Sequence, residues 1–143
     1  MPCPVKDYMD EDIPTVDSEA STLEVAKMMA ERHESYFVVL RNSQLAGIVT
    51  EGDILRKVIA AERSPSEVKI SEIMSSPLVT IGRDEEVSVA AKKMIDHDVR
   101  RLPVVRDSIL YGVITMRDLA KHFNDYNEKV VKDIFRSMSL FHV

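Results

Sequence analysis

The chain has 143 residues, which suits one compact domain or two small halves that share a core. Hydrophobic residues make up 45% and charged residues 30%, an ordinary balance for a soluble globular protein, and the net charge of -5 argues against nucleic-acid binding through bulk charge. The single cysteine, Cys3, excludes an intramolecular disulfide, no apolar run approaches the ~18 residues of a membrane span, and no signal-peptide pattern opens the chain. These features predict a cytoplasmic protein without a membrane partner.

The first half of the chain alternates short apolar segments with two helices. A helical turn is expected up to Met9, then an extended segment around Pro14, because the residue before a proline avoids the helical region. Ser21 followed by Glu24 forms a capping-box pattern for a helix. The apolar face that we expect this helix to bury consists of Leu23, Ala26, Met29 and Ala30.

Two strands and a second helix complete this half. Residues 36–40 form a continuous apolar run and residues 45–49 a second one, with a turn at Asn42-Ser43 between them. The second helix is expected from about Gly52 to about Ala61. The polar stretch of residues 62–69 is interpreted as a linker.

The second half repeats this order. A turn over residues 70–74 and an extended segment at residues 77–80 lead to a helix for which Asp84 is the candidate N-cap. The apolar face expected for that helix consists of Val87, Ala90, Ala91, Met94 and Ile95. Strands are expected at residues 102–105, with Pro103 at the start where a missing donor is tolerable, and at residues 109–114, followed by a closing helix over residues 116–123.

An internal duplication organises the chain. Gly47-Ile48-Val49-Thr50-Glu51-Gly52-Asp53 returns as Gly112-Val113-Ile114-Thr115-Met116-Arg117-Asp118, 65 positions later. The boundaries that follow are repeat 1 at residues 5–61, repeat 2 at residues 70–123 and an amphipathic helix within residues 124–143. That helix is expected to fold back on its own domain or to pack on another subunit.

Each Thr-x-x-Asp places two oxygen-bearing side chains and several backbone N–H groups where a strand turns into a helix. Such a place can bind a sugar hydroxyl or an anion. The alternative is structural, because threonine is a good N-cap and an acidic residue at N3 can reach back to it. Both roles can hold at once, since a cap that faces a cleft can also accept a hydrogen bond from a ribose.

A Met-containing turn, a Pro segment, an Ala/Met helix, an apolar strand and Gly-apolar-apolar-Thr-x-x-Asp, all present twice, resemble a tandem pair of cystathionine-β-synthase (CBS) domains, a Bateman module. The resemblance covers about residues 5–123 and implies an α/β (α+β) fold of two β-α-β-β-α repeats with pseudo-two-fold symmetry. It also implies a stand-alone regulatory module, not an enzyme, with an adenine nucleotide such as AMP, ADP or ATP as regulatory ligand and no other cofactor. The family binds its ligands in clefts between the repeats and commonly forms homodimers, and the effector is expected to be a separate protein.

The resemblance also implies the roles of single residues. Asp53 and Asp118 would accept hydrogen bonds from ribose hydroxyls, Thr50 and Thr115 would bind ribose or phosphate, and Ile48 and Val113 would flank the base or sugar. Each aspartate would work with residues of the other repeat. For Asp53 these partners are Leu78, Val99, Arg100 and Arg101, and for Asp118 they are Thr15, Glu34, Ser35 and Tyr36.

The two sites are predicted to be unequal. Arg100-Arg101-Leu102-Pro103 is similar to the basic-residue-Leu-Pro pattern that contacts phosphates in nucleotide-binding members, and guanidinium groups suit phosphate oxygens. The first half has Ser35-Tyr36 at that position, so Asp53 is predicted to belong to the better nucleotide site. Arg117 is a further candidate for phosphate, whereas a solvated strand edge is the alternative for the arginine pair and a core position for Tyr36.

Other functions stay open on the sequence. S-adenosylmethionine or another adenosyl compound is an alternative ligand, and a ligand-independent assembly module is an alternative role. Nucleic-acid binding through the arginines is disfavoured by the acidic balance. No metal spacing and no catalytic constellation are recognised among the four histidines and Cys3.

Overall fold

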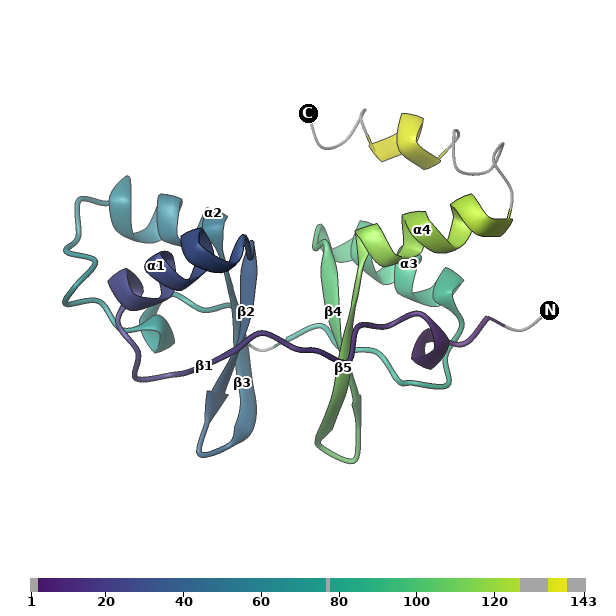
Figure 1. The fold of residues 1–143 in the computed structure, drawn as a ribbon, viewed down its shortest axis with the longest axis horizontal. Helices are drawn as coiled ribbons and strands as arrows, with labels where there is room; N and C mark the ends of the chain where they lie inside the picture. Colours follow the sequence, from purple (N-terminus) through teal and green to yellow (C-terminus); the bar gives the residue numbers. More distant parts are fainter. Residues whose placement is uncertain (1–2, 77, 127–133, 139–143) are drawn as a thin grey trace. The chain divides into compact units, whose positions relative to one another are not determined.

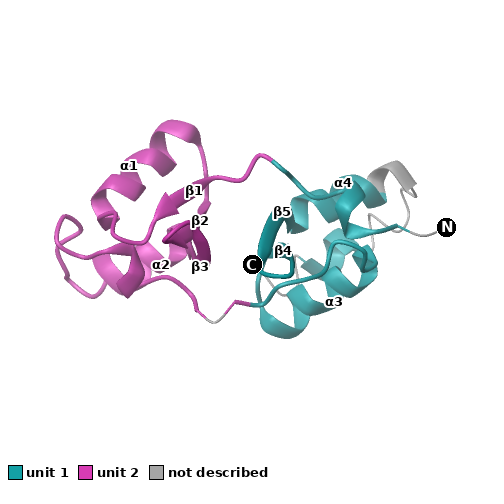
Figure 2. Cartoon of the chain, turned by 90° about the horizontal axis from the view of Figure 1, so that it is seen from below, with its two compact units in different colours: residues 1–11, 79–143 teal, residues 12–78 magenta. Residues whose placement is uncertain are grey.

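A computed structural model describes residues 3–76, 78–126 and 134–138 (Figure 1). The chain divides into two compact units, residues 12–78 (unit 2) and residues 1–11 with 79–143 (unit 1), drawn in different colours in Figure 2. Each unit is described by itself. No helix in the described part of the chain combines the length and the apolar character that crossing a membrane requires.

Unit 2 is a three-stranded sheet with two helices on one side (Figure 1). Its elements in order are β1 (Thr15–Asp17), α1 (Thr22–Arg32), β2 (Tyr36–Arg41), β3 (Gln44–Thr50) and α2 (Glu51–Ile54), which continues as a π-helix η2 (Leu55–Ile59), and then the 3-10 turn η3 (Ile70–Glu72). β1 pairs with β2 in parallel and β2 with β3 in antiparallel orientation. The β2–β3 turn holds Asn42 and Ser43 at φ 51° and 63°, which matches the twist of a tight hairpin.

Unit 1 repeats the arrangement. It contains η1 (Val5–Asp7), α3 (Val87–His97), β4 (Arg101–Arg106), β5 (Ile109–Thr115) and α4 (Met116–Tyr126), and residues 134–138 are helical. Its first strand is reduced to a single parallel bridge between Ile81 and Val104. The predicted α/β fold of two β-α-β-β-α repeats is thus confirmed. The remaining residues of the predicted terminal helix, 127–133 and 139–143, lie outside the described residues.

A proline explains why the first strand is shorter in unit 1. In unit 2 the Val38 N–H donates to the Pro14 carbonyl at 2.8 Å and holds β1 on the sheet. The equivalent residue in unit 1 is Pro103, which has no N–H to donate. Pro103 is the third residue of β4 and pairs with Val113, so the expectation that it starts the strand is wrong.

The short turns that open the two repeats pack into different units from the helices that follow them. Ile70 and Ile73 lie in the core of unit 2 with Val25 and Phe37, whereas Val5 lies in the core of unit 1. The stretch predicted as a linker also packs on unit 2. Val68 is 4% exposed, and its carbonyl accepts from the backbone N–H and the hydroxyl of Thr22, both at 2.8 Å.

The repeated glycines let these turns approach the strands. A Cβ on Gly47 would lie 2.7 Å from Met74 Sδ and 2.8 Å from the Ser75 carbonyl oxygen. A Cβ on Gly112 would lie 2.7 Å from the Asp10 carbonyl oxygen and 2.8 Å from Met9 Sδ. Each glycine therefore permits a backbone bridge beside it, Ile48 to Ser75 in unit 2 and Val113 to Asp10 in unit 1.

Three sequence expectations about the helices need revision. Ser21 caps α1 as predicted, with its Oγ accepting from the Glu24 N–H at 3.1 Å. Leu23, 38% exposed, and Ala30 are exposed, however, because the buried face runs through Thr22, Val25 and Met29. In α3 the buried face is Val87, Ala90 and Met94, and Ile95 is 68% exposed. Glu86, not Asp84, precedes the first residue of α3, and Asp84 binds Lys6 Nζ at 3.0 Å instead.

Candidate ligand-binding site

In unit 2 the first Thr-x-x-Asp closes a complete capping box. Asp53 Oδ2 accepts from the Thr50 backbone N–H at 2.9 Å and lies 3.1 Å from Thr50 Oγ1, which in turn accepts from the Asp53 N–H at 3.1 Å. β3 ends at Thr50 and α2 begins at the next residue, so the strand-to-helix turn fixes both side chains. The structural role that the sequence left open is therefore real for this pair.

The second carboxylate oxygen of Asp53 is held by a cation. Lys57 Nζ lies 3.1 Å from Asp53 Oδ1, and Arg56 Nη2 lies 4.0 Å from the same oxygen. The Asp53 side chain is 7% exposed and that of Lys57 44%. Lys57 also donates to the Ile73 carbonyl at 2.9 Å, so one ammonium group joins the cap to the turn that packs beside it. Charge-assisted hydrogen bonds of this kind are among the stronger ones in proteins, so the buried carboxylate is well partnered.

In unit 1 the second Thr-x-x-Asp forms the same cap with fewer partners. Asp118 Oδ2 accepts from the Thr115 N–H at 2.9 Å, and Thr115 Oγ1 accepts from the Asp118 N–H at 3.1 Å. Asp118 is half-buried. Among the described residues no cation pairs with this carboxylate and no donor reaches its Oδ1, so this oxygen is open to a ligand.

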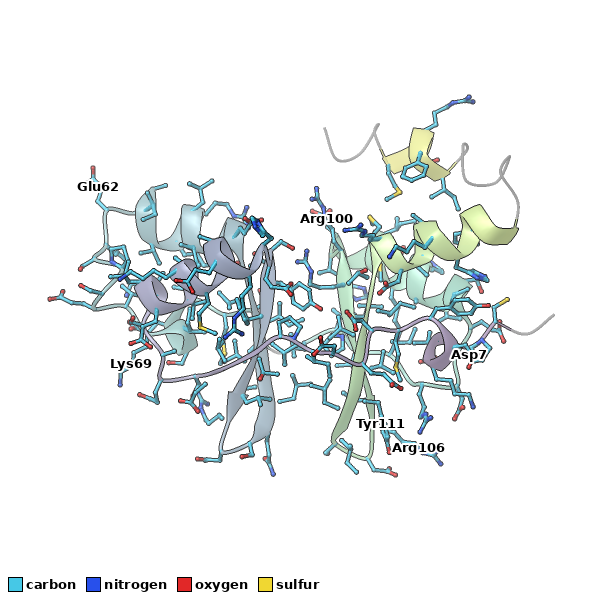
Figure 3. All side chains as sticks on the ribbon, in the orientation of Figure 1. Asp7, Glu62, Lys69, Arg100, Arg106 and Tyr111 are labelled. Atoms are coloured by element: carbon cyan, nitrogen blue, oxygen red, sulfur yellow. The ribbon has the colours of Figure 1, made fainter. Side chains whose placement is uncertain are left out.

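The strand that runs beside each cap brings further predicted residues to the same edge. In unit 1 Arg101 pairs with Thr115 across β4 and β5, and the Arg100 carbonyl accepts from the Met116 N–H at 2.8 Å. Figure 3 shows Arg100 at this end of β4. Arg100 and Arg117 are exposed and Arg101 is half-buried, so three cations accompany the Thr115–Asp118 cap in its own unit.

Unit 2 has neutral residues at the equivalent strand positions. Tyr36 pairs with Thr50, and the Ser35 carbonyl accepts from the Glu51 N–H at 3.0 Å. Tyr36 is 7% exposed, which agrees with the alternative of a core position, whereas Ser35 is exposed. The charges near this cap come from α2 and η2 rather than from a strand.

The other predicted site residues occupy varied environments. Ile48 and Val113 are 6% and 0% exposed, each one residue past the glycine that accommodates a turn. Pro103 is buried, Thr15 is exposed in β1, and the half-buried residues are Glu34, Leu78 and Val99. The predicted partnerships of Asp53 with Arg100 and of Asp118 with Tyr36 join different units, and they remain predictions.

Metal-binding chemistry has no support in the described residues: residues 3–76, 78–126 and 134–138 contain no group of three His, Cys, Asp or Glu side chains that could hold an ion. What the two edges offer is a carboxylate, a hydroxyl and, in unit 1, guanidinium groups. These suit a molecule that combines hydroxyls with anionic groups.

The family model described as "CBS domain" matches the chain twice, over residues 5–60 and 70–125. The chain belongs to the CBS domain family. It is a tandem CBS-domain pair, a regulatory module, and both copies of Thr-x-x-Asp lie inside the matched ranges. The resemblance drawn from the sequence is thereby confirmed.

Two curated relatives match most of this chain. An uncharacterized protein of Methanopyrus kandleri is 37% identical over 110 residues, which are 76% of this chain and 56% of that protein. The CBS domain-containing protein YhcV of Bacillus subtilis is 31% identical over 116 residues, which are 81% of this chain and 82% of YhcV. The chain thus spans little more than half of the first relative and most of the second.

Two solved structures share both the fold and 28% of the aligned residues with this chain. The CBS domain pair of protein MJ0100, solved in complex with 5′-methylthioadenosine and S-adenosyl-L-methionine, is 28% identical with a TM-score of 0.79, and the match covers 89% of this chain and 100% of that one. The hexameric CBS-CP12 protein from bloom-forming cyanobacteria is 28% identical with a TM-score of 0.75 over 83% of this chain and 67% of that one.

Sequence reasoning missed Lys57, the residue that most distinguishes the two edges. The signal was present, because a lysine four residues after an aspartate on a helix is a standard ion-pair spacing. The segment from about Gly52 to about Ala61 was predicted only as a helix, and its charged residues were not considered. The equivalent position 65 residues later holds His122. Both positions lie outside the Thr-x-x-Asp motifs, so a comparison of the motifs alone does not reveal this difference.

Proposed function

We propose that this CBS pair senses an adenosine-containing molecule, an adenine nucleotide such as AMP, ADP or ATP or a related adenosyl compound. The ligand binds at the edges where Thr50–Asp53 and Thr115–Asp118 cap their helices. The regulatory signal passes to a separate effector protein, and the module itself has no catalytic part.

The open oxygen of Asp118 carries the proposal. A ribose presents two neighbouring hydroxyls, and a carboxylate with an unoccupied oxygen is the acceptor that they require. Thr115 and Arg117 lie on the same turn, and Arg100 and Arg101 lie on the adjacent strand end, where guanidinium groups suit phosphate oxygens. The adenosyl ligands in the structure of the MJ0100 pair support the same class of ligand here.

Ligand binding regulates only if it favours one conformation over another. The turns bridged to Ile48 and Val113 are the elements that connect each cap to a neighbouring segment, so a ligand at the cap changes the energy of that contact. The proposed assembly is a homodimer, and the hexamer formed by the CBS-CP12 protein supports self-association of such pairs. Residues 5–61 and 70–123 are the proposed ligand-binding repeats.

Thermal melting against a panel tests the proposal. The panel contains AMP, ADP, ATP, S-adenosylmethionine, NAD and adenosine, and a compound that binds only the folded protein raises the melting midpoint. At 100 times the dissociation constant the added stability is about 2.7 kcal/mol. We expect a rise with at least one adenosyl compound and its loss in the double variant Asp53→Ala/Asp118→Ala.

The matched control is Asp96→Ala, because Asp96 also pairs with a lysine four residues away on a helix but lies in α3. It should lower the midpoint slightly and keep the ligand response. A flat panel for the wild-type chain, with association that depends on concentration, would instead support a ligand-independent assembly module. Salt-sensitive RNA or DNA binding lost in Arg100→Ala would support the nucleic-acid alternative.

A further inference from the structure

The two caps share the same pair of hydrogen bonds to backbone N–H groups, but their carboxylates differ in capacity to accept further hydrogen bonds. A carboxylate has about four lone-pair positions. Asp53 receives the Thr50 N–H, the Thr50 hydroxyl and Lys57, which leaves about one position. Asp118 receives only the Thr115 N–H from the described residues, which leaves about three. The two hydroxyls of a ribose therefore find room on Asp118 and not on Asp53.

The difference originates in one pair of equivalent residues. Lys57 in unit 2 corresponds to His122 in unit 1, 65 positions later. Lys57 binds Asp53 and the Ile73 carbonyl. His122 is 8% exposed and turns its ring toward Tyr8, the equivalent of Ile73, with the ring centroids 3.9 Å apart. Both residues thus attach the helix to its neighbouring turn, but only the lysine also occupies the aspartate.

The surroundings of Lys57 hold it on Asp53. The Asp53 side chain is 7% exposed, so the ion pair is partly shielded from water, and Arg56 adds a second cation at 4.0 Å. The helix winds as a π-helix over Leu55–Ile59, the stretch that contains Lys57, whereas α4 is a regular helix over the equivalent residues. A diol that bound Asp53 would have to displace the lysine and leave the Ile73 carbonyl without this donor.

We propose that Lys57 is a specificity-determining residue that closes the Asp53 half to diols, so that only the Asp118 half accepts a ribose. This inference rests on the proposed adenosyl-binding function and differs from the sequence-based preference for the Asp53 site. It assigns the ribose to the Asp118 cap of unit 1.

The test measures the stoichiometry and the diol dependence of binding. Equilibrium dialysis uses adenosine and 2′,3′-dideoxyadenosine, which lacks both hydroxyls, with the full chain and its variants. The wild type is expected to bind one adenosine per chain, at least about tenfold tighter than the dideoxy compound, because a missing hydrogen bond to a charged group weakens binding by about that factor. Asp118→Asn should lose this preference.

The decisive variants change Lys57. Lys57→Met and Lys57→His should add a second adenosine site per chain with its own diol preference, and Lys57→Arg should keep one. Lys92→Met is the matched control, since Lys92 pairs with Asp96 at the same spacing on α3, and it should leave the stoichiometry unchanged. Circular dichroism melting tests whether each variant is folded. If Lys57→Met does not fold, Lys57→His alone is used to test for the second adenosine site.

The outcomes separate the two proposals. If neither the wild type nor any variant binds adenosine, an adenine nucleotide or S-adenosylmethionine, the proposed function and this inference both fail. If the wild type binds two adenosines with equal diol preference, or if Lys57→Met and Lys57→His keep a single site, the function stands and the role of Lys57 is refuted. Loss of binding in Asp53→Asn with retention in Asp118→Asn would also refute it.

Discussion

Truncating the two cap aspartates should destabilise the protein by different amounts. Asp53→Ala removes an acceptor of the Thr50 N–H, a partner of the Thr50 hydroxyl and the anion of the Lys57 ion pair. Asp118→Ala removes only the acceptor of the Thr115 N–H among the interactions of the described residues. The structure therefore predicts a larger loss of stability for Asp53→Ala than for Asp118→Ala, although the repeated sequence alone makes the two substitutions equivalent.

The magnitudes follow from the individual contacts. A capping hydrogen bond contributes about 1 kcal/mol, which is the expected cost of Asp118→Ala. For Asp53→Ala the hydroxyl contact adds about 1 kcal/mol and the half-exposed ion pair about 0.5 kcal/mol, since solvent screens Lys57. The free energy of unfolding should thus fall by about 2.5 kcal/mol for Asp53→Ala and by about 1 kcal/mol for Asp118→Ala.

Urea unfolding at pH 7 measures this difference. Far-UV circular dichroism is the suitable probe because the chain has no tryptophan. The control Asp96→Ala removes a surface ion pair from α3 and should change the free energy of unfolding by less than about 0.5 kcal/mol. The reasoning is refuted if Asp118→Ala destabilises the chain as much as Asp53→Ala or more.

Three further predictions concern the fold. Gly112→Ala should lower the free energy of unfolding by about 1–3 kcal/mol, because the added Cβ meets the Asp10 carbonyl oxygen. The control Gly82→Ala should not lower it, since a Cβ there meets only the Glu85 side chain, at 3.4 Å. Equal urea midpoints of the two variants would contradict this. The Lys69 N–H and the Arg63 guanidinium hold the pKa of Glu72 below its usual value. The interactions of the ionised Glu72 therefore add to the free energy of unfolding above about pH 5, and this stabilisation is lost as the pH falls through the lowered pKa. Glu72→Gln should flatten the acid side of the curve of melting midpoint against pH, and an unchanged curve would argue against that role. Pro103→Val should add an N–H that binds the Val79 carbonyl and exchanges slowly in hydrogen-exchange NMR; fast exchange would exclude proline as the reason for the missing strand.

The repeated fold could be predicted because its signals are local. The 65-residue period aligned Thr50 with Thr115 and Gly47 with Gly112, and the strand-to-helix turn follows from the apolar run before each threonine. The cap at Ser21 was predicted correctly because a capping box is written in four consecutive residues.

The packing of the turns could not be predicted for the opposite reason. Val5 and Ile70 open equivalent turns, and their apolar character shows that they are buried but not in which core.

The width of a helix's buried face could not be predicted either. Ile95 continues the apolar pattern of α3, yet the buried face of this helix consists only of Val87, Ala90 and Met94. A periodicity defines a helix and its broad face, whereas the width of the buried stripe is set by tertiary contacts.

The two helix caps were predictable from the sequence, whereas the side-chain partners of their carboxylates were not. Thr-x-x-Asp indicated both a helix cap and a ligand contact, and the caps are present in both units. The preference for Asp53 came from Arg100 and Arg101, which pair with the Thr115 edge in their own unit. What the sequence comparison lacked was the partner of each carboxylate, which is decided by a side chain one helical turn further on.

Amide NMR of the full chain with 5′-methylthioadenosine is the measurement that tests the central claim most directly. The account predicts chemical-shift changes that centre on Thr115, Met116 and Asp118, the residues of the turn that holds the open carboxylate oxygen of Asp118. Asp118→Asn should abolish these changes while the remaining spectrum stays that of the folded protein. Saturating ligand without any shift at the two Thr-x-x-Asp turns would contradict the account and leave both motifs as helix caps alone.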